Sequence, residues 1–294
     1  MQSLDKIKRR IRSIETTSKI TGAMKLVATA KMKRLMNQHK VVHDFCQDFY
    51  DIIEILVKTI HPEDTKKKNE NQTNLWILIS SSLGLCGSFN INVCKHLMSK
   101  MKHDDKVIVI GRKGFNYLRS HDLLNSVIQH LDFSNNNLDY LEMLPLCEQI
   151  INEYHSHKFN TVRLVYTKFV NSLTFDPIDI QLLPFDSSLF QHLNPQDKKM
   201  SLDLDEKKRE IEYEPSKEDI LESSISIFIA TTIFAAISES RVCENGARRN
   251  AMETATDNAK DLMNELTLEF NDARQQNITQ EINEIVAGAD GSSN

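Results

Sequence analysis

The residues best suited to chemistry lie in a glycine-rich stretch, SSSLGLCGSFN, at positions 80–90. The stretch follows an apolar run and precedes a helical pattern, and backbone N–H groups at such a turn can bind phosphate. It matches neither GxxxxGK[ST] nor GxGxxG, and no acidic residue stands where a ribose would need one. A strand-to-helix turn without a ligand is therefore favoured, as it is for GRKGF at 111–115.

Two histidines, His39 and His43, stand one helical turn apart, a spacing that zinc ligands use. No third ligand stands near them, so an exposed polar face is favoured, as it is for His155 and His157. Cys86 lies between glycines and could act as a nucleophile, but no basic partner is identifiable and a small buried thiol is favoured. The sequence therefore predicts no catalytic residue and no metal or cofactor site.

Charge is divided unevenly along the 294-residue chain, whose formal net charge is −5. Residues 1–40 contain eleven Lys or Arg and two acidic residues, whereas residues 212–294 contain six and sixteen. Oppositely charged ends favour attraction to each other before attraction to outside partners. The basic residues recur at helical spacing without an aromatic platform, which argues against a nucleic-acid-binding arm.

The cysteines show neither CxxC nor Cys/His spacing; they are Cys46, Cys86, Cys94, Cys147 and Cys243. A reducing compartment fits this pattern better than a disulfide framework or a structural zinc site. The sequence contains no run of about 18 apolar residues, so no membrane span is predicted. Its first 20 residues lack the apolar core of a signal peptide, so secretion is not expected.

Each end of the chain predicts one very long helix. From Leu4 to about Val57 there is no proline and one glycine, and apolar residues recur every three or four positions. This predicts a helix of about 50 residues, roughly 75–80 Å long. Ser216 has the features of an N-cap, with Asp219 three residues on, and a second helix of about 70 residues is predicted from there to Val286.

Both helices carry a seam of apolar or small residues. The seam residues are Ile7, Ile11, Ile14, Thr21, Met24, Ala28, Met32 and Leu35 in the first helix and Ile225, Phe228, Met252, Ala255, Ala259, Met263, Leu266, Phe270, Ala273, Ile278, Ile282 and Ile285 in the second. Helices of this length are typical of coiled coils, so the two are expected to pair antiparallel. Small residues allow their backbones to approach closely. These residues are Ala28, Ala30, Ala255 and Ala259.

The middle of the chain alternates between strand and helix patterns. Strands are predicted at 75–80, 106–111, 161–169 and 172–183, and helices at 90–101, 112–119 and 138–157. The first two strands are continuous apolar runs, typical of buried parallel strands. Pro177 favours an edge position for the last strand.

The predicted fold class is α/β: a long antiparallel coiled coil of the N- and C-terminal helices plus a central Rossmann-like α/β domain. The predicted segments are an N-terminal helix at 1–60, a linker at 61–74, the central domain at 75–185, a polar linker at 186–215, a C-terminal helix at 216–287 and a flexible tail at 288–294.

Several stretches resemble the gamma subunit family of F-type ATP synthases, whose members form the central rotor shaft. IKRRIRSIETTSKITGAMKLVATAKMKR, at 7–34, is similar to the family's N-terminal pattern. ATDNAKDLMNELTLEFNDARQQNITQEINEIVAGA, at 255–289, is similar to its C-terminal signature. Between them, ISSSLGLCGSFN, VIVIGRKG and YTKFVNSLTFDPIDIQLLP resemble the central domain.

The resemblance implies that the end helices form a coiled coil inside a ring of three alpha and three beta subunits. It implies that the middle domain touches epsilon (delta in mitochondria) and a ring of membrane c subunits. Rotation would then couple ion flow through the c-ring to ATP synthesis or hydrolysis in the alpha–beta ring. The subunit would bind no nucleotide itself. It would be peripheral to the membrane, on the cytoplasmic face in bacteria or the matrix side in mitochondria.

The resemblance also implies roles for individual residues. Met24 and its basic neighbours would face acidic segments of beta, and Arg274 and Gln275 would hydrogen-bond a beta loop in one rotary position. The expected beta contacts are Lys19, Met24, Lys25, Arg248, Arg274, Gln275 and Thr279. The expected tip, running in an apolar bearing, consists of Ile278, Ile282, Ile285 and Val286.

Two places depart from the family pattern. Ser82 and Leu83 stand where relatives carry Asp and Arg or Lys, so a surface ion pair is not expected there. Arg249 stands where a methionine is usual. An alternative function is a gamma-like shaft or coiled-coil adaptor of a specialised ATPase motor without a proton channel. Binding of epsilon and a c-ring by the middle domain separates the two functions.

Overall fold

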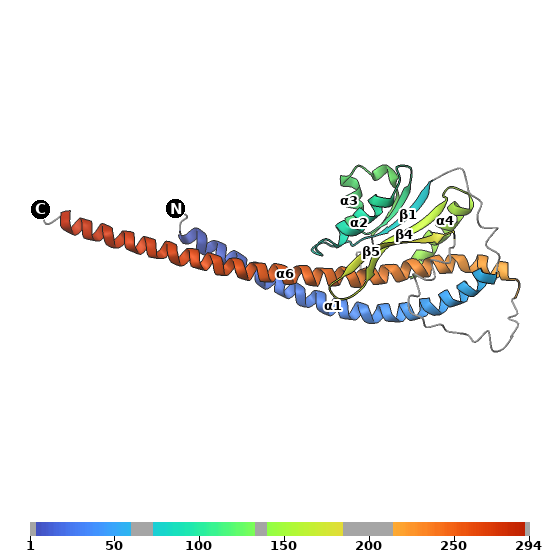
Figure 1. The fold of residues 1–294 in the computed structure, drawn as a ribbon, viewed down its shortest axis with the longest axis horizontal. Coiled ribbons are helices and arrows are strands. Elements are labelled where there is room, and N and C mark those ends of the chain that lie inside the picture. The colour runs from blue at the N-terminus through green and yellow to red at the C-terminus, as the bar shows by residue number, and fades with distance from the viewer. Residues whose placement is uncertain (1–3, 60–72, 133–139, 185–213, 292–294) are drawn as a thin grey trace. The chain divides into compact units, whose positions relative to one another are not determined.

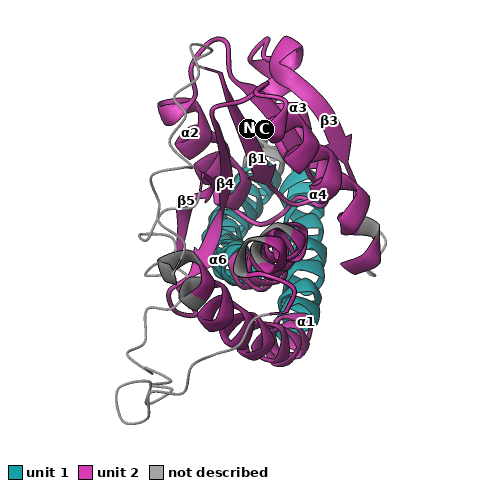
Figure 2. Cartoon of the chain, turned by 90° about the vertical axis from the view of Figure 1, so that its right-hand side faces the viewer, with its two compact units in different colours: residues 1–29, 248–294 teal, residues 30–247 magenta. Residues whose placement is uncertain are grey.

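A computed structural model of the chain describes residues 4–59, 73–132, 140–184 and 214–291 (Figure 1). It has two compact units, one of residues 1–29 with 248–294 and one of residues 30–247 (Figure 2). We refer to them as unit 1 and unit 2. The two longest helices, α1 (Leu4–Thr59) and α6 (Lys217–Gly291), contribute to both units. Most of the predicted linkers 61–74 and 186–215 lies outside the described residues.

Unit 2 is built around a five-stranded sheet with the order β3-β2-β1-β4-β5. The strands are β1 (Asn74–Ile79), β2 (Lys106–Ile110), β3 (Val127–Leu131), β4 (Thr161–Phe169) and β5 (Phe175–Leu183). The first four run parallel to their neighbours, and β5 pairs antiparallel with β4. Pro177 lies in this edge strand, as predicted, and the sheet order is the Rossmann-like one.

Helices cover both faces of the sheet (Figure 1). Alternate residues of β1 point to opposite faces, so that Trp76 and Leu78 meet α2 (Phe89–Lys100) and α3 (Arg112–Ser120). Leu75, Ile77 and Ile79 meet α4 (Tyr140–His155), α1 and α6 on the other face. A strand buried on both faces needs a continuous apolar run, and for this reason the sequence predicts β1 and β2 as buried strands.

The part of α1 and α6 in unit 2 belongs to the main hydrophobic core. Tyr50 of α1 and Phe228 of α6 are buried there, with their rings edge to face at 5.5 Å. The sequence predicts that both helices are separate from the central domain, whereas the compact units divide between residues 29 and 30 and between residues 247 and 248. Shared burial with the sheet explains why these helical segments group with it.

Helix α6 begins where the sequence predicts. The Ser216 hydroxyl accepts a 3.1 Å hydrogen bond from the Asp219 N–H and donates to the Asp219 carboxylate at 2.6 Å. Such an N-cap satisfies a backbone donor that the helix leaves open. At its other end the helix runs to Gly291, four residues beyond the predicted end at 287.

Between Ser223 and Val286, α6 also contains an 18-residue window that is apolar enough to cross a membrane by length and composition, with a mean hydropathy of 1.4. The absence of a long apolar run in the sequence predicts no such window. Of this window, 56% is buried inside the protein. A core helix packed on a sheet has the same composition as a membrane span, so this window does not argue for membrane insertion.

Strand β3 is a feature that the sequence analysis missed. It follows a 3₁₀ turn at Leu124–Ser126, and no residue of Val127–Leu131 is fully buried. An edge strand is protected less than a central one, so its sequence can be short and interrupted by polar residues such as Gln129 and His130. The pattern that identified β1 and β2 is therefore absent here.

The predicted antiparallel pairing of α1 and α6 is present in each unit. In unit 1 the hydroxyls of Thr21 and Thr256 lie 2.7 Å apart, and the ammonium of Lys25 lies 2.8 Å from the carboxylate of Glu253. In unit 2 the pairing continues with Tyr50 against Phe228. Across these contacts the residue numbers of α1 increase while those of α6 decrease, as expected for antiparallel helices. The Lys25–Glu253 ion pair is also an example of the predicted attraction between the basic and acidic ends.

Burial follows the predicted seam closely. Every predicted seam residue of α1 is buried or partly buried, and so is every one of α6 up to Ala273. Ala28 is 2% exposed and Ala259 is 8% exposed, consistent with close backbone approach. The prediction for Ala30 was wrong, because this residue is exposed. Residues two positions apart are separated by about 200° around an α-helix, so the Ala30 side chain points to the face opposite that of Ala28.

A buried carboxylate joins α2 to the edge of the sheet. The Asp179 side chain of β5 is 3% exposed and is bound by His96 at 2.8 Å, by Lys100 and by Arg163. Burial alone would raise the pKa of Asp179, but the hydrogen bonds from Lys100, His96 and Arg163 lower it well below its usual range. The ionised form is therefore the one that the fold stabilises.

We predict that Asp179→Asn lowers the free energy of unfolding by about 2–3 kcal/mol at pH 7, because charged hydrogen bonds to Asp179 are lost. The folded pKa lies below the unfolded one, so this stabilisation is present above the unfolded value and disappears as pH falls. Urea unfolding at pH 7 and pH 3 measures both effects. The control is Asp257→Asn, in an exposed pair with Lys260, with an expected change within about 0.5 kcal/mol. Equal losses in the two variants would contradict the prediction.

We also predict that Ala28→Leu destabilises unit 1 by about 1–3 kcal/mol, because the buried position has no room for three more carbons. Hydrogen exchange across residues 4–29 and 248–273 measures the local loss. The matched control is Ala30→Leu, at an exposed position of the same helix, with an expected change within about 0.5 kcal/mol. Faster exchange in the control than in Ala28→Leu would count against a closely packed seam.

Candidate functional site: the exposed end of α6

The glycine-rich stretch at 80–90 uses its polar groups within the protein. The N–H of Ser81 donates to Asn90 Oδ1 at 2.9 Å, and Ser80 Oγ accepts the N–H of Gly114 at 2.9 Å. Gly111 has a φ of +101°, and a side chain there would meet the Ser80 carbonyl oxygen at 2.1 Å. The glycines of GRKGF thus permit close packing against the end of β1. These contacts support the interpretation of both stretches as structural turns.

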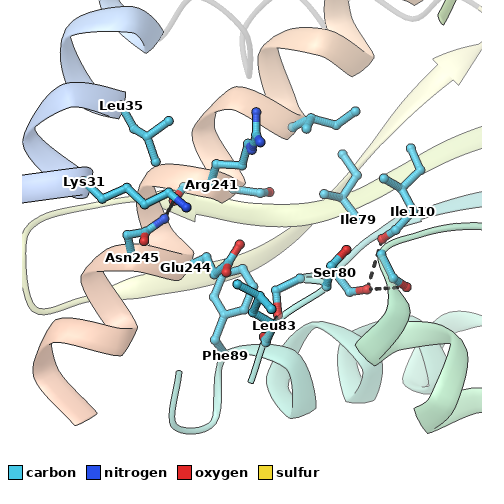
Figure 3. Close-up of a pocket in the computed structure, with 15 residues that line it drawn as sticks. Lys31, Leu35, Ile79, Ser80, Leu83, Phe89, Ile110, Arg241, Glu244 and Asn245 are labelled. Carbon is cyan, nitrogen blue, oxygen red and sulfur yellow. Dashed lines mark hydrogen bonds between the residues drawn. The ribbon is translucent and has the colours of Figure 1, made fainter. Parts of the chain in front are cut away.

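A cavity of about 60 Å³ lies at the carboxyl ends of β1 and β2, beside α1 and α6 (Figure 3). Its polar lining includes Lys31, Arg241, Glu244 and Asn245. Ligand pockets for small molecules are typically about 300–1,000 Å³. The cavity is therefore too small for a nucleotide, although it lies at the sheet edge where doubly wound folds bind them.

The histidine pair departs from its expected place on an exposed polar face. His39 and His43 are partly buried, with ring centroids 5.8 Å apart, on the side of α1 that faces α6 and β4. His39, His43, Cys46 and Tyr50 recur every three or four residues, which is the signal that could have revealed this face. Among the residues that the structure describes, no group of three or more His, Cys, Asp or Glu could hold a metal ion. Cys86 is buried, as predicted.

The departures from the family pattern have local partners. Ser82 donates a hydrogen bond to the Asp132 carboxylate, and Arg112 Nε lies 3.1 Å from the same group. The Ser82 hydrogen bond is the main reason that the pKa of Asp132 is below its usual range. A surface ion pair thus exists here, formed by Arg112 rather than by residue 83. Arg249 donates to the Asn250 side chain at 2.9 Å and 3.2 Å.

The expected beta contacts near the middle of the pairing differ in accessibility. Lys19 is exposed and bound to Glu15 one turn earlier at 2.8 Å, and Lys25 is bound across the pair to Glu253. Met24 is partly buried in the seam. Arg248 is only 8% exposed, which removes it from the surface on which a partner could bind.

The C-terminal part of α6 has a different environment, and we refer to residues 274–286 as the tip segment. All of its residues are exposed, and Ala273 is the last partly covered position among the helix residues whose burial is described, which end at Val286. The pairing of Thr21 with Thr256 places Leu4, the first described residue of α1, level with about residue 273. Residues beyond that point have no described section of α1 opposite them. The tip segment is therefore a single helix.

This single helix is amphipathic. Its apolar side consists of Ile278, Ile282, Ile285 and Val286, which are 44%, 54%, 72% and 54% exposed. The polar residues begin beside this stripe and continue around the helix; they are Asp272, Gln275, Gln276, Thr279, Gln280, Asn283 and Glu284. The Thr279 hydroxyl donates to the Gln275 carbonyl at 2.9 Å, and Arg274 is exposed beside them. An apolar stripe that its own chain leaves open is typical of a surface that another protein covers.

Comparison with known proteins gives consistent results for sequence and fold. A family model described as ATP synthase matches residues 3–291. The ATP synthase gamma chain of Ureaplasma urealyticum serovar 10 is 38% identical, with 98% of this chain and 99% of that protein covered. The ATP synthase gamma chain of Malacoplasma penetrans is 38% identical over 99% and 100% of the two chains. A chain in the central stalk and c-ring structure of the Tetrahymena thermophila mitochondrial ATP synthase has a TM-score of 0.60 at 22% identity, covering 80% of this chain and 99% of its own.

Proposed function

The chain belongs to the family of ATP synthase gamma chains, the central-stalk subunits of F-type ATP synthases, and from this premise we propose that α1 and α6 act as a rotor shaft. The shaft turns inside a ring of three alpha and three beta subunits. It couples ion-driven rotation of a c-ring to ATP synthesis or hydrolysis in that ring. The subunit itself transmits torque and contributes no catalytic group.

The observation that carries the proposal is the exposed tip segment. A lone helix with four exposed aliphatic side chains gains free energy when a partner covers them, at about 25 cal/mol per Å² of apolar surface. The ring of alpha and beta subunits supplies such a cover. Burial of apolar surface has no preferred direction, so Ile278, Ile282 and Ile285 can pack against an apolar bearing without resisting rotation.

Polar residues beside this stripe provide contacts that can be made and released. Arg274, Gln275 and Thr279 are exposed and hydrogen-bond a beta loop in one rotary position. A single hydrogen bond of this kind contributes about 0.5–1.5 kcal/mol, small enough to be broken at each step of rotation. Angular preference arises because these residues occupy only part of the helix surface.

Electrostatic attraction acts further along the shaft. Lys19 and Lys25 belong to the strongly basic first 40 residues and face acidic segments of beta. Charge complementarity across a moving interface favours correct approach more than it adds affinity. Lys25 exchanges its Glu253 partner for a beta carboxylate as the shaft turns, and Met24 packs beside it.

The sheet of unit 2 serves as the other contact region. It binds epsilon and the c-ring, so the complex lies on the cytoplasmic face of a bacterial membrane with this chain peripheral to the lipid. The bacterial origin of its relatives at 38% identity supports this side rather than a mitochondrial matrix.

Affinity purification of the tagged chain from its native cell in mild detergent, read by mass spectrometry, tests the whole assignment. Recovery of alpha, beta, epsilon and c subunits together supports the rotor of an ATP synthase. Recovery of alpha and beta without c or epsilon would favour a shaft in an ATPase motor that lacks a proton channel. Recovery of none of these subunits would overturn the rotor proposal.

We predict that Arg274→Ala lowers ATP hydrolysis by the assembled complex two- to tenfold, the effect of about one hydrogen bond. The unfolding temperature of the chain should not change, because Arg274 is exposed. Steady-state ATPase assays of the reconstituted complex measure the loss. Arg119→Ala, which removes an exposed arginine from α3, serves as the control and should retain full activity. Full activity in both variants would exclude the proposed role of Arg274.

We further predict that Ile282→Glu weakens assembly with the alpha–beta ring at least tenfold, because a carboxylate would enter an apolar bearing. The isolated chain should keep its helix content, since Ile282 is exposed there. Asn283→Glu introduces the same charge one position away on the polar side and should assemble normally. Titration of each variant against the ring provides the affinities, and similar values would argue against an apolar bearing.

A further inference from the structure

A second cavity in unit 2, of about 90 Å³, lies where α1 and α6 pack on β4 and β5. Its lining is unusually polar for a hydrophobic core. The lining residues are His39, His43, Cys46, Tyr50, Tyr166, Lys168, Ile180, Thr232, Ala235, Ala236 and Glu239. Neither the family assignment nor the rotor proposal gives these residues a role.

Two polar atoms in this lining have unmet hydrogen-bonding capacity. The Tyr50 hydroxyl and His39 Nδ1 are buried, and neither makes a hydrogen bond of good geometry with the described residues, although Thr232 and Cys46 lie beside the hydroxyl. The Tyr50 side chain is only 3% exposed. Buried polar groups are almost always hydrogen-bonded, either to protein or to ordered water. The two atoms therefore have capacity for a hydrogen-bonding partner in the cavity.

Other polar groups surround these two atoms from each neighbouring element. From α1 come His43 and the Cys46 thiol, from α6 Glu239, and from β4 Tyr166 and Lys168. One oxygen of Glu239 accepts the Phe169 N–H at 2.9 Å, which leaves acceptor capacity on the carboxyl group. The cavity lining thus contains hydrogen-bond donors, hydrogen-bond acceptors, and basic and acidic side chains.

The size and composition of the cavity limit what it can bind. A buried water needs about 10–15 Å³ of accessible space and two to four polar partners, so 90 Å³ has room for several. A nucleotide or similar organic ligand needs several times more space. The described residues contain no group of three metal-ligating side chains, which argues against a metal ion.

We propose that this cavity is a binding site for a cluster of ordered water molecules that links Tyr50 and His39 of α1 to Glu239 of α6 and Lys168 of β4. The inference rests on the geometry of unit 2 and is independent of the rotor proposal. Water-mediated hydrogen bonds are enthalpically close to direct ones and exchange partners readily. The cluster therefore holds both long helices to the sheet through bonds that adapt to small displacements.

The protonation states of the lining are compatible with this arrangement. Burial, with a smaller contribution from His43, lowers the pKa of His39 to about 4, so its imidazole is neutral at pH 7 and Nδ1 can donate or accept. Burial raises the pKa of Glu239, while the Phe169 N–H and the charge of Lys168 partly oppose this. A water cluster can serve either form of this carboxyl group.

The test is a structure of the assembled complex at a resolution that shows water, for the wild type and for Tyr50→Phe. We expect density within hydrogen-bond distance of Tyr50 Oη and His39 Nδ1, and loss of the water next to residue 50 in the variant. The unfolding temperature of the full-length variant should fall by about 2–4 °C. Tyr117→Phe, on α3 and partly exposed, is the control and should be unchanged.

Two outcomes would overturn the proposal. A cavity without density in the wild type would show that it is dry, and Tyr50→Phe would then be as stable as the wild type or more so. A single strong peak with the short coordination distances of a metal ion would show that the ligand is not water.

Discussion

In each unit, α1 and α6 lie antiparallel, and this contact between the two ends of the chain is the interaction on which the remaining structure depends. The middle of the chain must leave α1 and return to α6, so the sheet is inserted between two helices that are already opposed. In unit 2 their inner faces join the core under β1 and β4. Among the described residues of unit 1 they pack on each other, through small side chains and the Thr21–Thr256 and Lys25–Glu253 contacts.

The same helix α6 thus has three environments along its length. It is a core helix around Phe228, a paired helix around Ala259 and a single exposed helix from Arg274 onward. In the proposed rotor, a partner subunit covers the apolar side of the last part. A helix that joins its own core around Phe228 and is exposed and amphipathic from Arg274 onward suits the proposed role in the central stalk of an F-type ATP synthase.

In the rotor proposed above, the chain acts through weak contacts distributed over its surface, whereas an enzyme concentrates strong contacts in one site. The polar turns at the ends of β1 and β2 bond to their own chain, and the cavity there is small. Buried polarity is concentrated instead beside Tyr50 and Glu239, where the long helices meet the sheet. The hydrogen bonds proposed for the cavity and for the exposed end of α6 can both exchange partners. Such bonds are compatible with a rotor subunit that must bear strain without unfolding.

Periodicity in the sequence was enough to predict both long helices, their pairing and the central strands, because a repeat of three and four residues over fifty positions, or a continuous apolar run, is compatible with few alternatives. The family was also identifiable from local motifs. Local motifs and periodicity did not predict strand β3, the exposure of Ala30 or the burial of His39 and Arg248. Whether one face of a helix is buried depends on residues about 200 positions away in the sequence. Tyr50, for example, contacts Phe228 only in the folded chain. Local sequence specifies which faces are apolar, while long-range packing selects the side chains that lose contact with water.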